Sequence, residues 1–191
     1  NHAGFGCDDQ PALIADGLRQ RTKQPWNYVY AQSWITKDRR CLERGRGDDV
    51  ETEGVAFFTP ERIVDSSWVR LSEGRVGLAT RVASMPDVPV IVTHLAASRQ
   101  NQAGRARELE TLLPWATRQS PGLLLGDLNA SPDADELAPV LAHYRDAWAN
   151  AAERGAALGA RRARHAPRGG AVGRGGRRRR RRRQVPRLGA V

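Results

Sequence analysis

The chain has 191 residues, enough for one ordinary domain, and a formal net charge of +10, which at first indicates a nucleic-acid-binding protein. The charge is unevenly spread, because residues 155–191 hold 13 Arg and no acidic residue, so the preceding 154 residues have a net charge of −3. Two cysteines, Cys7 and Cys41, exclude a disulfide-rich scaffold and a zinc site built from cysteines alone. We therefore predict a folded domain over residues 1–154 and a separate Arg/Gly/Ala-rich disordered tail over residues 155–191.

The first predicted elements are a helix and a strand region. Residues 10–22 place Leu13, Ile14 and Leu18 on one side of a short amphipathic helix, with a proline near its first turn. Residues 26–36 are rich in Trp, Tyr, Val and Ile and predict one or two strands.

A charged loop over residues 39–53 precedes a run of strands. Strand signals separated by turn residues occur at residues 55–59, 63–71, 75–83 and 88–94. Apolar alternation predicts a half-buried strand at 75–83, whereas the nearly continuous apolar run 88–92 predicts a strand covered on both faces. No apolar stretch is long enough to span a bilayer, so we expect a soluble protein, cytoplasmic or secreted.

The hydrophobic period then changes to that of a helix. Residues 101–117 place apolar side chains at helical spacing, residues 122–125 predict a short buried strand, and residues 132–143 predict another helix. A helix, several strands, a helix, a strand and a helix make an α+β order, with helices lying on the faces of sheets.

The stretch Leu123–Pro132 has the most informative polar residues. In an extended backbone, residues two apart face the same way, so Asp127 and Asn129 can converge on one ligand, the carboxylate accepting and the amide donating hydrogen bonds. Ser131 is predicted to cap the following helix, with Pro132 at its first position. The alternative interpretation is turn chemistry alone, because Gly, Asp and Asn are ordinary turn residues.

A second apolar strand also ends in polar residues, Thr93 and His94. Histidine transfers protons near neutral pH, although a single histidine at a strand end is usually structural. The two motifs share one geometry, and this favours a common function. Three arginines that follow His94 are interpreted as a solvated helix face rather than as phosphate ligands: Arg99, Arg105 and Arg107.

Three motifs occur in one order: Gly54-Val55-Ala56-Phe57-Phe58, then Thr93-His94-Leu95, then the run from Gly126 to Pro132. Together they resemble the endonuclease/exonuclease/phosphatase superfamily, the DNase-I-like group, over about residues 1–150. The resemblance implies an α+β fold, a four-layered α/β/β/α sandwich of two mixed sheets, here truncated. It also implies hydrolysis of phosphate esters, above all phosphodiesters, with Mg²⁺ or alternatively Mn²⁺ as the metal.

The resemblance implies a role for each site residue. Asp127 binds the metal or orients the attacking water, Asn129 holds the scissile phosphate, and His94 hydrogen-bonds a phosphate oxygen or stabilises the charge that develops there. These roles suit the reaction, which needs a hard cation, oxygen ligands and donors aimed at phosphate oxygens. The substrate is expected to be nucleic acid or a small or lipid phosphodiester.

Other residues of the family pattern have no counterpart in the sequence. An early Asn, a metal-binding Glu in a Gln-Glu pair and a late Asp-His pair are missing, so we expect a chain that is incomplete at both ends and impaired in activity. Arg, Gly, Ala and Pro make up 30 of the residues 155–191, a composition that out-of-frame translation of GC-rich DNA would give. The alternative is a genuine arm in which Arg177–Arg183 bind nucleic acid or another polyanion while the folded part is a non-catalytic scaffold.

Overall fold

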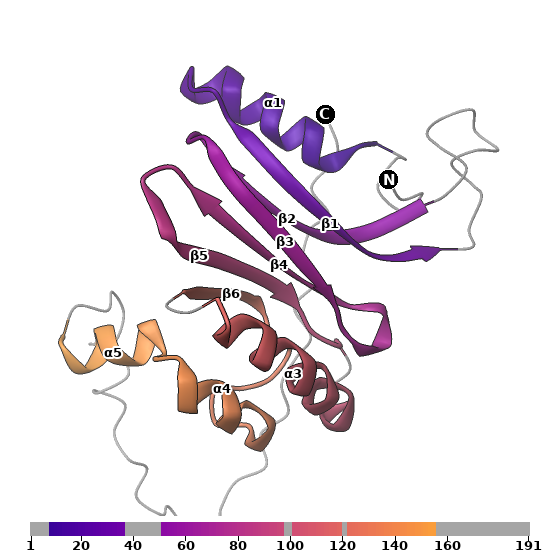
Figure 1. Ribbon diagram of the computed structural model, residues 1–191, viewed down its shortest axis with the longest axis vertical. Helices are drawn as coiled ribbons and strands as arrows, with labels where there is room; N and C mark the ends of the chain where they lie inside the picture. The colour runs from indigo at the N-terminus through magenta and orange to yellow at the C-terminus, as the bar shows by residue number, and fades with distance from the viewer. Residues whose placement is uncertain (1–7, 37–50, 98–100, 120–121, 156–191) are drawn as a thin grey trace, which may run out of the picture. The chain divides into compact units, whose positions relative to one another are not determined.

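A computed structural model describes residues 8–36, 51–97, 101–119 and 122–155 (Figure 1). The chain divides into two compact units, residues 1–146 and 147–191. Both cysteines, most of the predicted charged loop and the arginine-rich tail beyond residue 155 lie outside the described residues. The predicted domain boundary after residue 154 falls within the second unit and stays a prediction.

Helix α1 (Gln10–Thr22) forms where the sequence predicts it. Asp9 caps its start, since the carboxylate accepts a backbone N–H of the first turn at 3.1 Å. The predicted apolar side is wrong, however: Leu13 and Ile14 are about half exposed, and Ala15 is the buried residue of the helix. The helix packs mainly on one strand of the smaller sheet, so the surface that it covers is narrow.

The described strands form two sheets (Figure 1). The smaller sheet pairs two strands in antiparallel fashion, β1 (Asn27–Thr36) and β2 (Glu51–Thr59). The larger sheet has the order β3-β4-β5-β6 and consists of β3 (Ile63–Arg70), β4 (Val76–Val82), β5 (Met85–His94) and β6 (Leu123–Asp127). β3, β4 and β5 are antiparallel neighbours, whereas β5 and β6 run parallel, so the larger sheet is mixed.

Helices cover the outer faces of the two sheets within residues 1–146. α1 packs on β1, and α3 (Gln102–Thr117) lies on the face of the larger sheet that is turned away from the smaller one (Figure 1). Asn101 caps α3 by accepting the N–H of Gly104 at 3.1 Å. The predicted α+β class and its α/β/β/α layer order are therefore confirmed.

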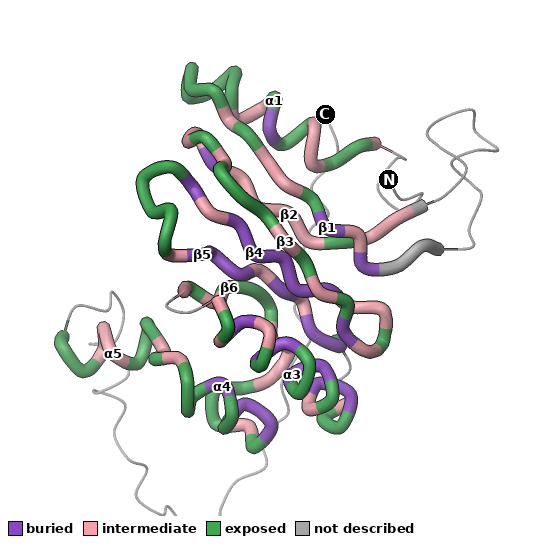
Figure 2. The backbone as a smooth tube through the Cα atoms, viewed as in Figure 1, coloured by how far each residue is buried: buried purple, intermediate pink, exposed green. Residues whose placement is uncertain are grey.

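Strand β4 is buried on both faces, and its predicted half-buried alternation is wrong (Figure 2). Val76 and Leu78 pack towards the smaller sheet against Ala31, whereas Ala79 and Ile91 pack towards α3. β4 lies between β3 and β5, so both of its faces meet another layer. Strand β5 has the predicted double cover at Val90 and Ile91.

Strand β6 is an edge strand, and the prediction of a buried strand is wrong. Leu123 and Leu125 are 48% and 49% exposed, whereas Leu124 between them packs on the core beneath α3. The smaller sheet contacts β3, β4 and β5. One side of β6 is consequently covered by α3 and the other is open.

The helix predicted over residues 132–143 is shorter than expected. A 3-10 turn η3 (Asp135–Leu137) leads into α4 (Ala138–His143), so Ser131 does not cap a helix. Its carbonyl instead accepts the N–H of Ala134 at 2.9 Å, which closes a turn. A second 3-10 turn, η2 (Ser72–Gly74), joins β3 to β4.

The described part of the second unit is the helix α5 (Ala147–Glu153). Across the described ranges, every helix is too short or too polar to cross a membrane.

Candidate functional site

The parallel strands β5 and β6 end side by side, and this places His94 next to Asp127. The register pairs Thr93 with Gly126 and His94 with Asp127. The main-chain N–H of Leu95 donates to the carbonyl oxygen of Asp127 at 3.0 Å, which extends the pairing past the strand ends. Two polar side chains that belong to separate sequence motifs thus share one edge of the sheet. Carboxyl ends of parallel strands are a common place for ligands in α/β sheets.

Gly126 allows the two strand ends to approach this closely. It has a φ of 141°, a value that L side chains rarely adopt. A Cβ at this position would also clash with the main-chain carbonyl of Thr93. Glycine is therefore needed to hold Asp127 beside His94.

The chain turns sharply after Asp127, so the extended geometry expected for Asp127 and Asn129 is wrong. Asn129 has a φ of 51°, in the left-handed region that Asn tolerates. Its N–H donates to Oδ1 of Asp127 at 2.9 Å, and its side-chain Nδ2 donates to the carbonyl oxygen of Leu95 at 2.9 Å. The Asn129 side chain therefore ties the loop after β6 to the chain that leaves β5.

Arg75 is a functional candidate that sequence reasoning missed. Its Nη1 lies 3.5 Å from Nδ1 of His94. A guanidinium can only donate, so this contact is a hydrogen bond when Nδ1 is the unprotonated ring nitrogen. Arg75 precedes β4, and because β4 and β5 are antiparallel, the start of one meets the end of the other. The antiparallel pairing of β4 with β5 is therefore the sequence feature that could have identified Arg75 as a neighbour of His94.

The smaller sheet also reaches this edge. Ser33 of β1 and Glu53 of β2 line a small cavity together with Arg75 and His94. His94 therefore lies on the face of the larger sheet that is turned towards β1 and β2. Asp127, its partner in the register, shares that face.

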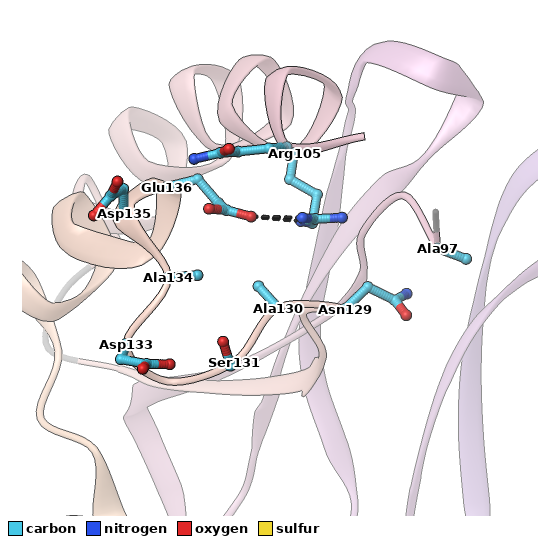
Figure 3. Close-up of a pocket in the computed structure, with 10 residues that line it drawn as sticks. Ala97, Arg105, Asn129, Ala130, Ser131, Asp133, Ala134, Asp135 and Glu136 are labelled. Carbon is cyan, nitrogen blue, oxygen red and sulfur yellow. Dashed lines mark hydrogen bonds and ion pairs between the residues drawn. The ribbon is translucent and has the colours of Figure 1, made fainter. Parts of the chain in front are cut away.

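A pocket of about 800 Å³ lies beside Asn129, on the side of α3 (Figure 3). Its wall includes Gln102 and Arg105 of α3 and the segment from Asn129 to Glu136. Arg105 points across the pocket wall to Glu136, and Asp133 lies at the opposite end near Ser131 (Figure 3). The pocket is polar and has room for a substituent several atoms in size.

The interpretation of Arg105 as a solvated residue is wrong. Its side chain is 4% exposed, and its Nη2 lies 2.6 Å from Oε1 of Glu136. Arg107, two residues further along the same helix, is exposed as predicted and forms a surface ion pair with Glu73 at 3.1 Å. Arg99 lies outside the described residues.

A metal site does not form from the residues that the structure describes. No group of three or more His, Cys, Asp and Glu side chains that could hold an ion occurs among them. Asp127 supplies one carboxylate, and its Oδ1 already accepts the N–H of Asn129. The donor set does not fit the hard-cation site that the resemblance implies, so the metal role of Asp127 stays a prediction.

Fold and site together define an α+β protein with polar side chains gathered at adjacent parallel strand ends. No family model and no curated protein matches the chain. Among solved structures, the catalytic domain of human nocturnin with a bound sulfate anion is similar, with 22% sequence identity and a TM-score of 0.45. The similarity covers 66% of this chain and 48% of that one.

TDP2 of D. rerio, complexed with a single-strand DNA product, is similar at 15% identity and a TM-score of 0.43, over 71% of this chain and 50% of that one. A form of D. rerio TDP2 humanized by 14 mutations is similar at 16% sequence identity and a TM-score of 0.42. The similarity covers 68% of this chain and 49% of that one. The chain spans about half the length of these solved structures.

Proposed function

We propose that the chain binds a phosphate ester at the ends of β5 and β6 and takes part in its hydrolysis. The register that pairs His94 with Asp127 carries this proposal, because it sets a carboxylate beside a hydrogen-bond donor. The amide of Asn129 and the guanidinium of Arg75 lie at the same edge. Donors that converge near one carboxylate suit the attack of water on an anionic ester.

Each side chain has a role that its contacts permit. In the tautomer that carries its proton on Nε2, His94 donates to a non-bridging phosphate oxygen, while Arg75 donates to Nδ1 and holds the ring in place. Asn129 uses one amide N–H on Leu95 and offers the second to the phosphate. Asp127 uses Oδ1 on the N–H of Asn129 and accepts a proton from the attacking water through Oδ2. The water oxygen bonds to phosphorus as the bond to the ester oxygen breaks, and that oxygen takes a proton from solvent.

The substrate is proposed to be a phosphodiester, either of nucleic acid or of a small or lipid molecule. Requirement for Mg²⁺ or Mn²⁺ stays a prediction, and so does polyanion binding by the tail, whose residues 156–191 lie outside the described part of the chain.

Turnover of bis(4-nitrophenyl) phosphate by the full chain tests this function, measured in EDTA and again with added Mg²⁺. We expect Asp127→Asn and His94→Ala each to lower turnover by roughly 10²- to 10⁴-fold, the usual contribution of a positioned acid or base. Asp87→Asn is the matched control, because Asp87 is an exposed carboxylate near the opposite end of β5. Wild-type turnover in the Asp127→Asn variant would contradict the proposal.

A further inference from the structure

Helix α3 buries two charged side chains that the proposed reaction does not use. Arg105 is 4% exposed and Glu108 is fully buried. Both contact the same residue, Ala96: its N–H donates to Oε2 of Glu108 at 2.9 Å, and its carbonyl accepts from Nη1 of Arg105 at 3.4 Å. Buried charges are costly unless they are bonded, so these contacts fix the helix to the chain that leaves β5.

The residue before Ala96 is held from the opposite side. The N–H of Leu95 donates to the carbonyl of Asp127, and its carbonyl accepts from the side chain of Asn129. The two residues that directly follow His94 are thus bonded on one side to the loop after β6 and on the other to α3. Their position sets where His94 and Asn129 lie relative to each other.

Arg105 also reaches the segment that follows Asn129. Its Nε and Nη2 donate to Oε1 of Glu136, at 2.9 and 2.6 Å (Figure 3). The Arg105 guanidinium holds the pKa of the Glu136 carboxyl below its ordinary value. Because Glu136 belongs to η3, the network closes a ring that joins the end of β5, α3, η3 and the loop after β6.

Stability alone does not account for the carboxylate of Glu108. Its Oε1 has no hydrogen-bond partner within the described residues, and burial raises the pKa of this carboxyl. An aliphatic side chain of similar size would avoid that cost only by leaving the buried N–H of Ala96 without its acceptor. The carboxylate of Glu108 therefore has its role in accepting the hydrogen bond from the N–H of Ala96.

We propose that Arg105 and Glu108 are positioning residues that place His94 and Asn129 for a phosphate ester by fixing Leu95 and Ala96. This inference rests on the function proposed above.

The test compares three variants of α3 in the full chain. Glu108→Leu removes the acceptor for Ala96, Glu108→Gln keeps an acceptor oxygen, and Glu110→Leu makes the same change at an exposed position of the helix. We expect Glu108→Leu to lower kcat for bis(4-nitrophenyl) phosphate by about 10- to 100-fold, the effect of misplacing reacting groups, at a temperature where the variant is fully folded. Glu108→Gln should stay within about threefold of wild-type kcat, and Glu110→Leu should match it.

The same comparison is made for Arg105, with Arg105→Met as the test variant and Arg107→Met, at an exposed position of α3, as its control. We expect kcat to fall in Arg105→Met and to stay at the wild-type value in Arg107→Met. Wild-type kcat in fully folded Glu108→Leu, or equal loss in Glu108→Leu and Glu110→Leu, would overturn the positioning role. A merely structural residue would lower activity only through the folded fraction.

A second readout does not depend on activity. In ¹⁵N NMR spectra, Glu108→Leu should shift the side-chain amide signals of Asn129 and speed hydrogen exchange at the N–H of Ala96, whereas Glu110→Leu should leave both unchanged. A wild-type chain that hydrolyses no phosphodiester would refute the proposed function, and these signals would still decide the positioning. Unchanged signals in Glu108→Leu would overturn the inference even if the wild type is active.

Discussion

The two faces of the larger sheet are packed in different ways, and the candidate site depends on both. Beneath α3, the larger cluster of buried residues joins Ile91 and Leu95 to the apolar face of the helix. Towards the smaller sheet, a smaller cluster joins Val76 and Leu78 to Ala31. The side chains of His94 and Asp127 lie on the second face, while the main chain that follows His94 is bonded from the first.

The comparison shows how one four-stranded sheet can have a well-packed face under α3 and an exposed edge at β6. The face beneath α3, with its buried polar network, fixes the backbone, whereas the opposite face is open at the edge strand β6 and leaves room for a ligand there. Leu123 and Leu125, which share the open face with Asp127, are half exposed for the same reason.

The largest expected effect is a difference in the free energy of unfolding between core substitutions on the two faces of the larger sheet. Leu112→Ala on the buried face of α3 should lower the free energy of unfolding by about 4 kcal/mol, because the larger cluster encloses the cavity that the change leaves. Leu78→Ala on the other face should cost about 2–3 kcal/mol, since fewer buried neighbours surround it. Urea unfolding monitored by circular dichroism measures both. Equal losses would show that the two faces are packed alike.

The next effect acts at the meeting point of β5 and β6. Gly126→Ala should destabilise the fold by about 2–3 kcal/mol, because it adds a Cβ at a φ of 141° and against the carbonyl of Thr93. The same urea titration checks this change, with Gly17→Ala as the control. Gly17 is a helical glycine of α1 with open space around it, so alanine there should stabilise the protein slightly. A Gly126→Ala variant as stable as the wild type would disprove the close approach of the strands.

The smallest effect is the pH dependence that Glu108 confers. Burial raises the pKa of its carboxyl, so the folded state binds the proton more tightly than the unfolded state does. The resulting stability is complete below the ordinary glutamate pKa and is lost as the pH rises through the raised value. Glu108→Gln should remove this loss, so its stability relative to the wild type should improve from acidic to neutral pH. Parallel stability profiles for the two proteins would contradict the assignment.

Elements with local signals could be predicted from the sequence. The proline near the first turn of α1, the helical period of α3 and the apolar runs of the strands depend on neighbours in sequence, and these elements form near the predicted positions. Strand β2 begins earlier than predicted, at Glu51 within the predicted charged loop. The exposure of a strand's side chains depends instead on which sheets and helices pack against that strand in the folded protein. The open face of β6 and the double cover of β4 follow from the sheet order, which no short stretch of sequence encodes.

The candidate site divides in the same way. His94 and Asp127 are at strand ends, as the motifs predict, and their pairing follows from parallel neighbours. The buried position of Arg105 depends on Glu136, 31 residues further along the chain, so a charge pattern within one helix gives no sign of it. Asn129 departs from the predicted extended geometry because its own N–H closes a turn onto Asp127.

The central claim is that the ends of β5 and β6 form a phosphate-ester site, and the turnover of bis(4-nitrophenyl) phosphate measures it most directly. Wild type, Asp127→Asn and Asp87→Asn should be compared at equal folded concentration. We expect turnover in the wild type and in Asp87→Asn, and a loss of roughly 10²-fold or more in Asp127→Asn. Equal turnover in all three proteins, or none in the wild type with or without Mg²⁺, would contradict the claim.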